Sequence, residues 1–299
     1  MPSRKPKSSR KKAPRPVIRR TQDWAHLKKE LDAFLHTVDW DTERDNDPVS
    51  FVWAYDNPED QEVVALIAAT MAYGRVSLLK KAIATVLAPL GESPAQTLRQ
   101  GLTPELMGAF DGFVYRMTQG DDVVALLRAI STALQKHGSL GALFAAGVED
   151  DDKDYQSALG KFVHTLREYA DSDRRGLRYL LSDPTSGSAC KRLCLFMRWV
   201  VRGPDKIDLG LWDGLDPAKL VMPLDTHIVR ISSYLGLTTR KSPDWKMAGE
   251  VTRALAKLSP EDPLRYDFAL CHLGISGSCP SKKDPVCCNQ CPIEAVCLL

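Results

Sequence analysis

Apolar residues recur every three or four positions along most of this chain. Trp24, Leu27, Leu31 and Leu35 form the first such run, and this spacing places them on one face of a helix. The same pattern predicts helices over 22–38, 56–74, 76–90, 103–109, 121–137, 139–147, 154–171, 174–182, 188–202, 226–235, 244–258 and 262–273. Few stretches alternate with a period of two, so the pattern predicts an all-α fold.

Capping residues and prolines mark several of the predicted helix ends. Asn57 and Pro58 precede two acidic residues, which is a typical helix start because free N–H groups and the helix dipole favour such residues there. Asp225 occupies the N-cap position of the helix predicted over 226–235, where its carboxylate can accept a bond from a free backbone N–H. Capping is therefore the structural alternative to any chemical role for Asp225.

Positive charge is concentrated at the start of the chain. Residues 1–20 contain nine Lys or Arg and no acid, which leaves 31 basic against 38 acidic residues in the remainder. Such a block is typical of a disordered arm that binds nucleic acid, but a solvated tail or an organelle transit peptide has the same composition. No apolar run reaches the length of about 18 residues that a membrane span needs. No apolar signal core follows the start either, so we expect a cytoplasmic protein.

Six of the eight cysteines lie in the last 29 residues. Such a cluster in a long chain without a secretion signal indicates a metal site in a reducing compartment rather than a disulfide scaffold. Cys279, Cys288, Cys291 and Cys297 are separated by eight, two and five residues. Four thiolates suit either zinc or an iron–sulfur cluster, and a set of spare surface thiols is the structural alternative.

The spacing Cys-x2-Cys-x5-Cys at the carboxyl end resembles the [4Fe–4S] loop of the helix-hairpin-helix DNA glycosylases, the superfamily of endonuclease III. The first gap is longer here, so Cys287 competes with Cys288 for the second ligand position. Cys288 keeps both later gaps intact and is the preferred ligand. The resemblance implies a structural [4Fe–4S] cluster, with zinc as the alternative, held by Cys279, Cys288, Cys291 and Cys297.

A second stretch carries the same resemblance. The sequence from Pro223 through Asp225, His227 and Arg230 to Gly236 is similar to the Val-Asp-Thr-His-x-x-Arg segment that holds the shared catalytic carboxylate of these glycosylases. The resemblance implies that Asp225 is this carboxylate. Base excision passes through a cationic sugar, and a fixed carboxylate can stabilise that charge or activate the nucleophile.

The resemblance also implies a nucleophile. Bifunctional members of the superfamily use a lysine, at the start of the second helix of the hairpin motif, that attacks C1′ and forms a Schiff base. The segment from Ser186 to Leu193 occupies the matching place, so Lys191 is the predicted nucleophile. The hairpin is reduced to Gly187 alone, and the gap from Lys191 to Asp225 is longer than in endonuclease III.

Basic residues near Lys191 suggest a surface for DNA. Lys191, Arg198 and Arg202 share one face of the helix predicted over 188–202, opposite its apolar residues. A cationic face directed away from the core is typical of a helix that contacts DNA, although an ordinary solvated face looks the same. The residues predicted to contact DNA are Arg192, Arg198, Arg202, Arg230, Tyr73 and Arg75. Tyr73 or Arg75 stands where the superfamily has a glutamine that enters the DNA, with core packing as the alternative.

Together these features predict two helical lobes with a cleft between them. The predicted parts are a basic arm over 1–21, a lobe with the hairpin over 52–202, a second lobe from 22–51 and 203–278, and a cluster loop over 279–299. The implied function is a DNA glycosylase with AP-lyase activity in base-excision repair, acting as a monomer on double-stranded DNA with a damaged base or an abasic site. A monofunctional glycosylase, a non-catalytic iron–sulfur protein that binds nucleic acid and an enzyme acting on RNA stay open.

Overall fold

The computed structural model of the protein describes residues 22–299. These residues form fifteen α-helices, five short 3-10 segments and one two-stranded hairpin, which confirms the predicted all-α class. The predicted arm over 1–21 lies outside the described residues. None of the helices described here combines the length and apolar character that crossing a bilayer requires.

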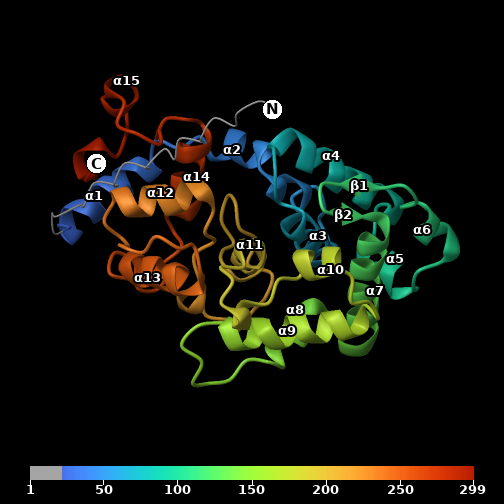
Figure 1. Cartoon of the computed structure of the whole chain (residues 1–299). Helices are drawn as coiled ribbons and strands as arrows, with labels where there is room; N and C mark the ends of the chain where they lie inside the picture. Colours follow the sequence, from blue (N-terminus) through green and yellow to red (C-terminus); the bar gives the residue numbers. More distant parts are fainter. Residues whose placement is uncertain (1–21) are drawn as a thin grey trace, which may run out of the picture.

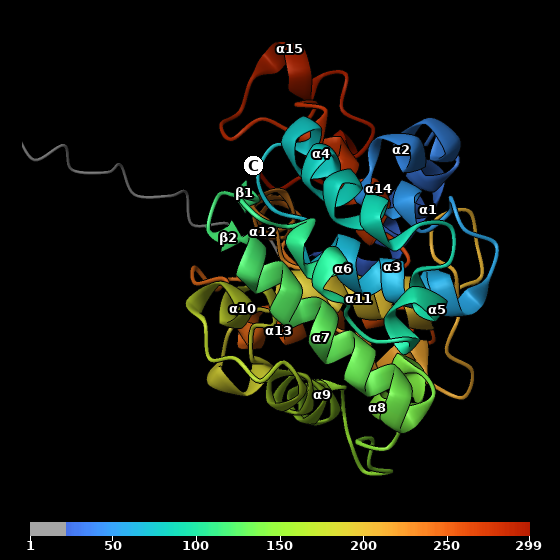
Figure 2. The same cartoon turned by 90° about the vertical axis from the view of Figure 1, so that its right-hand side faces the viewer.

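The helices between residues 58 and 180 lie together on one side of the molecule (Figure 1). They are α3 (Pro58–Thr70), α4 (Val76–Leu87), α5 (Pro94–Arg99), α6 (Pro104–Gly108), α7 (Gly120–His137), α8 (Leu140–Ala145), α9 (Gln156–Tyr169) and α10 (Arg175–Leu180). The long α7 packs against α5, α8, α9 and α10. The hairpin of β1 (Val114–Tyr115) and β2 (Thr118–Gln119) is antiparallel and lies beside α7, as Figure 2 shows.

Helices from both ends of the described chain form the other side of the molecule (Figure 1). They are α1 (Trp24–Leu35), α12 (Thr226–Tyr234), α13 (Trp245–Ala256), α14 (Asp267–Ile275) and α15 (Pro285–Cys288). The helix α12 packs against α14, and α1 contacts the 3-10 segment η5 (Glu294–Val296). The short helix α2 (Trp40–Asn46) packs against η1 (Pro48–Phe51), which in turn contacts α3. The remaining 3-10 segments are η2 (Ala88–Leu90), η3 (Pro184–Ser186) and η4 (Pro217–Lys219).

The centre of the molecule is occupied by α11 (Lys191–Val201), which packs against α3. Every residue of α11 after Lys191 is buried. The prediction that this helix presents a cationic face to solvent is therefore wrong. Arg192 and Arg198, 8% and 2% exposed, lie inside the protein because each has partners there that replace water.

The helix α3 shows how local sequence sets the core. Asn57 caps it by accepting a bond from the Glu59 N–H at 2.9 Å, and Pro58 supplies the first helical residue. The residues from Val63 to Ala69 are all fully buried. A helix that is apolar on all sides has to lie inside the protein, and the buried α11 supplies the partner surface.

Several elements differ from the sequence predictions. The helices α2 and α5 and the hairpin were not predicted. The helix α2 has seven residues, α5 has six, and each strand of the hairpin has two. Such elements are too short to show an apolar period. The final long helix, predicted from residue 262, begins only at Asp267.

Candidate active site

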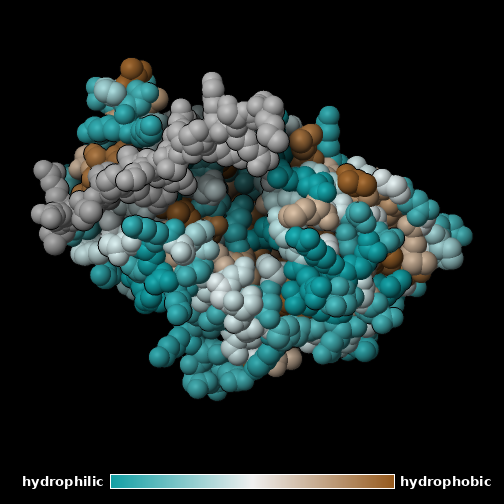
Figure 3. Space-filling view, viewed as in Figure 1, coloured by the Kyte–Doolittle hydropathy of each residue, from teal (hydrophilic) through white to brown (hydrophobic). Residues whose placement is uncertain are grey.

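A cavity of about 1590 Å³ lies where the two groups of helices meet. Its lining comes from the turn between α3 and α4, the start of α11, α12, α14 and residues 281–283. The face seen in Figure 3 is hollowed near its centre. Segments far apart in sequence therefore share one concave surface, which is the usual setting of a ligand site.

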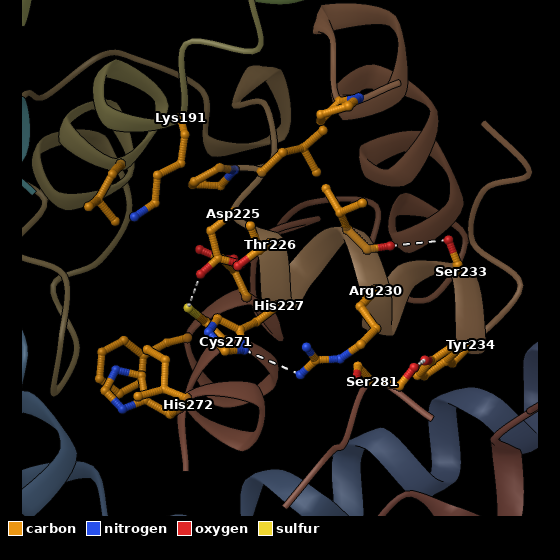
Figure 4. Close-up of a pocket in the computed structure, with 18 of the residues that line it drawn as sticks. Lys191, Asp225, Thr226, His227, Arg230, Ser233, Tyr234, Cys271, His272 and Ser281 are labelled. Atoms are coloured by element: carbon orange, nitrogen blue, oxygen red, sulfur yellow. Dashed lines mark hydrogen bonds between the residues drawn. The ribbon is translucent and has the colours of Figure 1, made fainter. Parts of the chain in front are cut away.

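Asp225 projects into this cavity from the start of α12 (Figure 4). Its Oδ1 accepts the Ile228 N–H at 2.6 Å, so the predicted N-cap is present. Its Oδ2 accepts the Cys271 thiol at 3.3 Å. Both carboxylate oxygens are held, and this fixes the direction in which the negative charge faces.

Lys191 enters the same cavity as the first residue of α11. Cys190 precedes it with a φ of 43°, a left-handed backbone conformation that makes α11 begin abruptly at Lys191. Figure 4 shows the Lys191 amine directed toward the side of the cavity that holds Asp225 and Cys271. The two residues predicted to be catalytic thus lie in one site.

Cys271, on α14, lines the same cavity but was not among the predicted site residues. Burial raises the pKa of its thiol, Asp225 and Asp267 raise it further, and Lys191 lowers it in part. The thiol therefore keeps its proton and can donate to Asp225. Cys271, Asp267 and His272 recur at helical spacing on α14 and all line the cavity, a pattern that could have indicated a polar face on this apolar helix.

His272 forms a second titratable group beside the first. Its Nδ1 lies 2.5 Å from the Glu43 carboxylate and its Nε2 lies 3.4 Å from Asp47. Its ring stacks on Phe268 with 4.1 Å between centroids. Burial lowers the pKa of His272, but the two carboxylates raise it more, so the pKa lies above its ordinary value.

The predicted DNA contacts Arg198 and Arg202 belong instead to a buried ion network. Arg198 Nε donates to Asp208 at 3.1 Å and its Nη1 donates to Asp267. Arg202 binds Asp208 at 2.7 Å and Asp262 at 3.0 Å. Burial raises the pKa of Asp267 to about 6 while Arg198 opposes that shift. These guanidinium groups cross-link the chain within the core, which corrects their predicted exposure on a DNA-facing surface.

Arg192 and Tyr73 also pack internally. Arg192 donates to the Thr70 carbonyl at 2.7 Å and to the Tyr179 carbonyl, and its guanidinium lies 4.1 Å from the Tyr179 ring. The Tyr73 hydroxyl lies 2.6 Å from Thr118 Oγ1 on the hairpin. Arg192 is thus a packing residue, not the predicted surface contact. Tyr73 is half-buried and lines the cavity, so its contact with DNA stays a prediction.

Exposed cations are present at the rim of the cavity. Arg75, Lys241, Lys282 and Lys283 are exposed and line its mouth. Arg230 also lines the cavity, and its Nη2 donates to the Cys279 carbonyl at 2.6 Å. Arg230 thereby joins α12 to the first cysteine of the carboxyl-terminal segment.

The thiols of this segment influence one another. Burial raises the pKa of Cys291, and the Cys279, Cys297 and Cys288 thiols raise it further. Burial likewise raises the pKa values of Cys279 and Cys297, and Cys288 adds to both. The cysteines are all free thiols within residues 22–299. In that part of the chain, however, no three His, Cys, Asp or Glu side chains are close enough to hold a metal ion. The chemistry of the donor set fits a thiolate-held cluster, and the cluster stays a prediction.

The fold and the site define a class of protein. It is an all-α protein whose large cavity is lined by a lysine, a carboxylate and a thiol. Residues 47–276 match the family described as Protein of unknown function (DUF2400), and the chain belongs to that family. No curated protein and no solved structure matches the chain. The matched residues include Lys191, Asp225 and Cys271, and they end before Cys279.

Proposed function

We propose that this protein is a DNA glycosylase with AP-lyase activity that acts on double-stranded DNA. The observation that carries the proposal is the meeting of Lys191 and Asp225 in one cavity, with both oxygens of Asp225 held by hydrogen bonds. A lysine beside a fixed carboxylate suits attack on a sugar carbon that develops positive charge.

The proposed reaction begins with a bond between Lys191 Nζ and C1′ of the extruded nucleotide. The electron pair of the C1′–N bond leaves with the base, and Asp225 takes the proton that the attacking nitrogen loses. The C1′–O4′ bond then breaks, O4′ takes the proton from Asp225, and the nitrogen lone pair forms the C1′=N bond of a protonated Schiff base. Asp225, again a carboxylate, takes a C2′ proton, the C2′=C3′ bond forms, and the 3′ phosphate leaves with the electron pair of the C3′–O bond. In this sequence the Cys271 thiol positions Asp225 and does not touch the sugar.

The rim of the cavity supplies the expected phosphate contacts. Arg75, Lys241, Lys282 and Lys283 are exposed there, on both sides of the site. Phosphate contacts of this kind position a duplex without reading its sequence. Each such contact should add to the salt dependence of DNA binding.

Cys279, Cys288, Cys291 and Cys297 are the residues that would hold a [4Fe–4S] cluster in this proposal. Four free thiols in a short segment match the ligand set of such clusters. The cluster would be structural, because it would fix residues 279–297 and keep the lysines between them at the cavity mouth.

Borohydride trapping on duplex DNA with an abasic site tests the reaction. The wild-type protein should give a covalent adduct, and Lys191→Ala should give none. Lys241→Ala is the matched control, since it removes another lysine of the same cavity and should weaken binding while keeping the adduct. An adduct with Lys191→Ala would move the nucleophile elsewhere. Binding without any adduct would favour a monofunctional enzyme or a protein that only binds DNA.

The cluster is tested separately by anaerobic purification with iron, sulfide and zinc analysis. We expect brown protein with about four iron atoms per chain. Cys288→Ser should lose the visible absorption, whereas the adjacent Cys287→Ser should retain it. Colourless protein that contains zinc would refute the iron–sulfur assignment.

A further inference from the structure

One wall of the cavity is built from apolar side chains of four separate segments. This apolar wall comes from η1, the turn after α3, α4 and α11, and its members are Pro48, Ala72, Val76, Leu79 and Leu195. Ala72, Leu79 and Leu195 are at most 7% exposed, and Val76 is 39% exposed, so the wall runs from the interior to the surface. We infer that the apolar wall determines which extruded base is accepted, and that it selects a base enlarged by a neutral alkyl group. This inference rests on the proposed function.

Contacts between these segments place the apolar wall beside the proposed nucleophile. The helix α3 packs against η1, α4 and α11, so the segments that carry the wall adjoin one another. Arg192 donates to the Thr70 carbonyl at 2.7 Å, which holds the start of α11, and with it Lys191, next to the end of α3. Leu195 follows Lys191 by four residues and therefore lies on the same face of α11. The wall is thus adjacent to the amine that is proposed to attack C1′, where the base is attached.

Polar side chains around the apolar wall are engaged within the protein. The Tyr73 hydroxyl lies 2.6 Å from a threonine hydroxyl of the hairpin, and each ring nitrogen of His272 faces a carboxylate. Arg198 and Asp267 bind each other and are each 2% exposed. The side chains of the wall itself have no hydrogen-bonding atoms. A base that packs here is therefore recognised by its shape and apolar surface rather than by hydrogen bonds.

Recognition of this kind favours an added alkyl group. Each methylene that leaves water for an apolar surface strengthens binding about fourfold. The cavity of about 1590 Å³ exceeds the roughly 300–1000 Å³ of common ligand pockets, so a larger base has room. A positive charge on the base would lose its water against this wall without gaining a partner, which favours a neutral base. The edge that carries the alkyl group packs against the wall, and the polar edge stays toward the water at the cavity mouth.

Uracil, thymine and 5-ethyluracil test this preference, because each adds one methylene to the last and all three have the same hydrogen-bonding groups. The wild-type protein is first bound to a duplex containing tetrahydrofuran in place of one nucleotide, which leaves the base pocket empty. Each free base is then titrated into this complex and its binding is followed by ligand-observed NMR. Affinity should rise about fourfold at each step and about fifteenfold over the series. Equal affinities, tightest binding of uracil or no binding of any base would overturn the inference.

Failure of the proposed function gives a different result. If the tetrahydrofuran duplex binds no better than an unmodified duplex, the repair function is contradicted at that step. The three bases are then titrated into the protein without DNA. A rise in affinity along the series there supports the apolar wall by itself, and its absence refutes the wall as well.

Variants of α4 assign the preference to the apolar wall. Leu79→Ala removes most of one side chain from the wall, so the affinity for 5-ethyluracil should fall to about that of uracil while uracil affinity stays unchanged. Ile83→Ala is the matched control, since Ile83 lies one turn further along α4, is fully buried and does not line the cavity. It should keep the fifteenfold rise.

A second variant covers the case in which Leu79→Ala does not fold. Val76→Thr keeps the shape of a side chain that is already 39% exposed and adds a hydroxyl group to the wall, so the rise over the series should shrink to about fourfold or less. Val114→Thr is its control, because Val114 is exposed on the hairpin outside the cavity and should keep the full rise. Folded Leu79→Ala or Val76→Thr protein that retains the fifteenfold rise would exclude the apolar wall as the determinant.

Discussion

Asp225 performs two tasks that a pair of substitutions can separate. Its Oδ1 caps α12 through the Ile228 N–H at 2.6 Å, and its negative charge faces the cavity. Asparagine offers a similar oxygen and is about as good an N-cap as aspartate. Asp225→Asn should therefore remove the charge and keep the cap, whereas Asp225→Ala should remove both.

The two tasks differ in magnitude. A positioned group that transfers a proton contributes about 10²- to 10⁴-fold in rate, so Asp225→Asn should slow adduct formation by that factor. Its free energy of unfolding should change by less than about 0.5 kcal/mol. Asp225→Ala should lose as much rate and, in addition, about 1 kcal/mol of stability, which lowers the unfolding midpoint by roughly 2–4 °C in a protein of this size.

Single-turnover borohydride trapping on abasic DNA measures the rate, and urea unfolding measures the stability. Abasic DNA is the suitable substrate because it requires no knowledge of which base is removed. Wild-type rates with Asp225→Asn would refute a catalytic role for the carboxylate. Equal destabilisation by the two substitutions would refute the separation of the charge from the cap.

Three further predictions concern buried groups. Glu62 accepts three N–H groups, so Glu62→Gln should cost about 1–3 kcal/mol in urea unfolding, and an unchanged midpoint would contradict this account. Burial lowers the pKa of His272, but Asp47 and Glu43 raise it above 6.5 overall; its contribution to stability is thus complete below pH 6.5 and is lost as the pH rises through the raised pKa. His272→Gln should flatten the fall in stability above neutral pH, and an unaltered pH profile would exclude His272 as its source. A Cβ on Gly120 would lie 2.0 Å from the Phe110 carbonyl oxygen, so Gly120→Ala should destabilise by about 1–3 kcal/mol, and a melting temperature equal to that of the wild type would exclude this clash.

Local patterns predicted the elements whose determinants are local. The helix α12 follows from Asp225 as its cap and from buried residues at helical spacing. The apolar length of α3 likewise indicates a buried helix. The residues Lys191 and Asp225 were found because each lies within a recognisable motif at a helix start. The predicted grouping of both in one site came from the resemblance to the helix-hairpin-helix glycosylases.

Long-range partners explain what the sequence did not reveal. Arg198 was predicted to face solvent because helical periodicity places it opposite the apolar residues of its helix. Its partner Asp267 lies 69 residues away, and helical periodicity contains no information on such a partner. His272 and Asp47 are 225 positions apart, so neither residue's neighbours in sequence indicate their contact. The ligands of the proposed cluster remain a prediction from spacing alone.

The contact between α1 and η5 has a consequence for synthesis of the chain. Residues 58–180 are contiguous, so their helices can pack while later codons are still being translated. The side that carries Asp225 contains α1 and also η5, and residues 58–180 are synthesised between them. Its packing is therefore complete only after residues 294–296 have been synthesised. The cavity between the two sides closes late for this reason, and a translation product that stops before α12 would contain Lys191 without Asp225 opposite it.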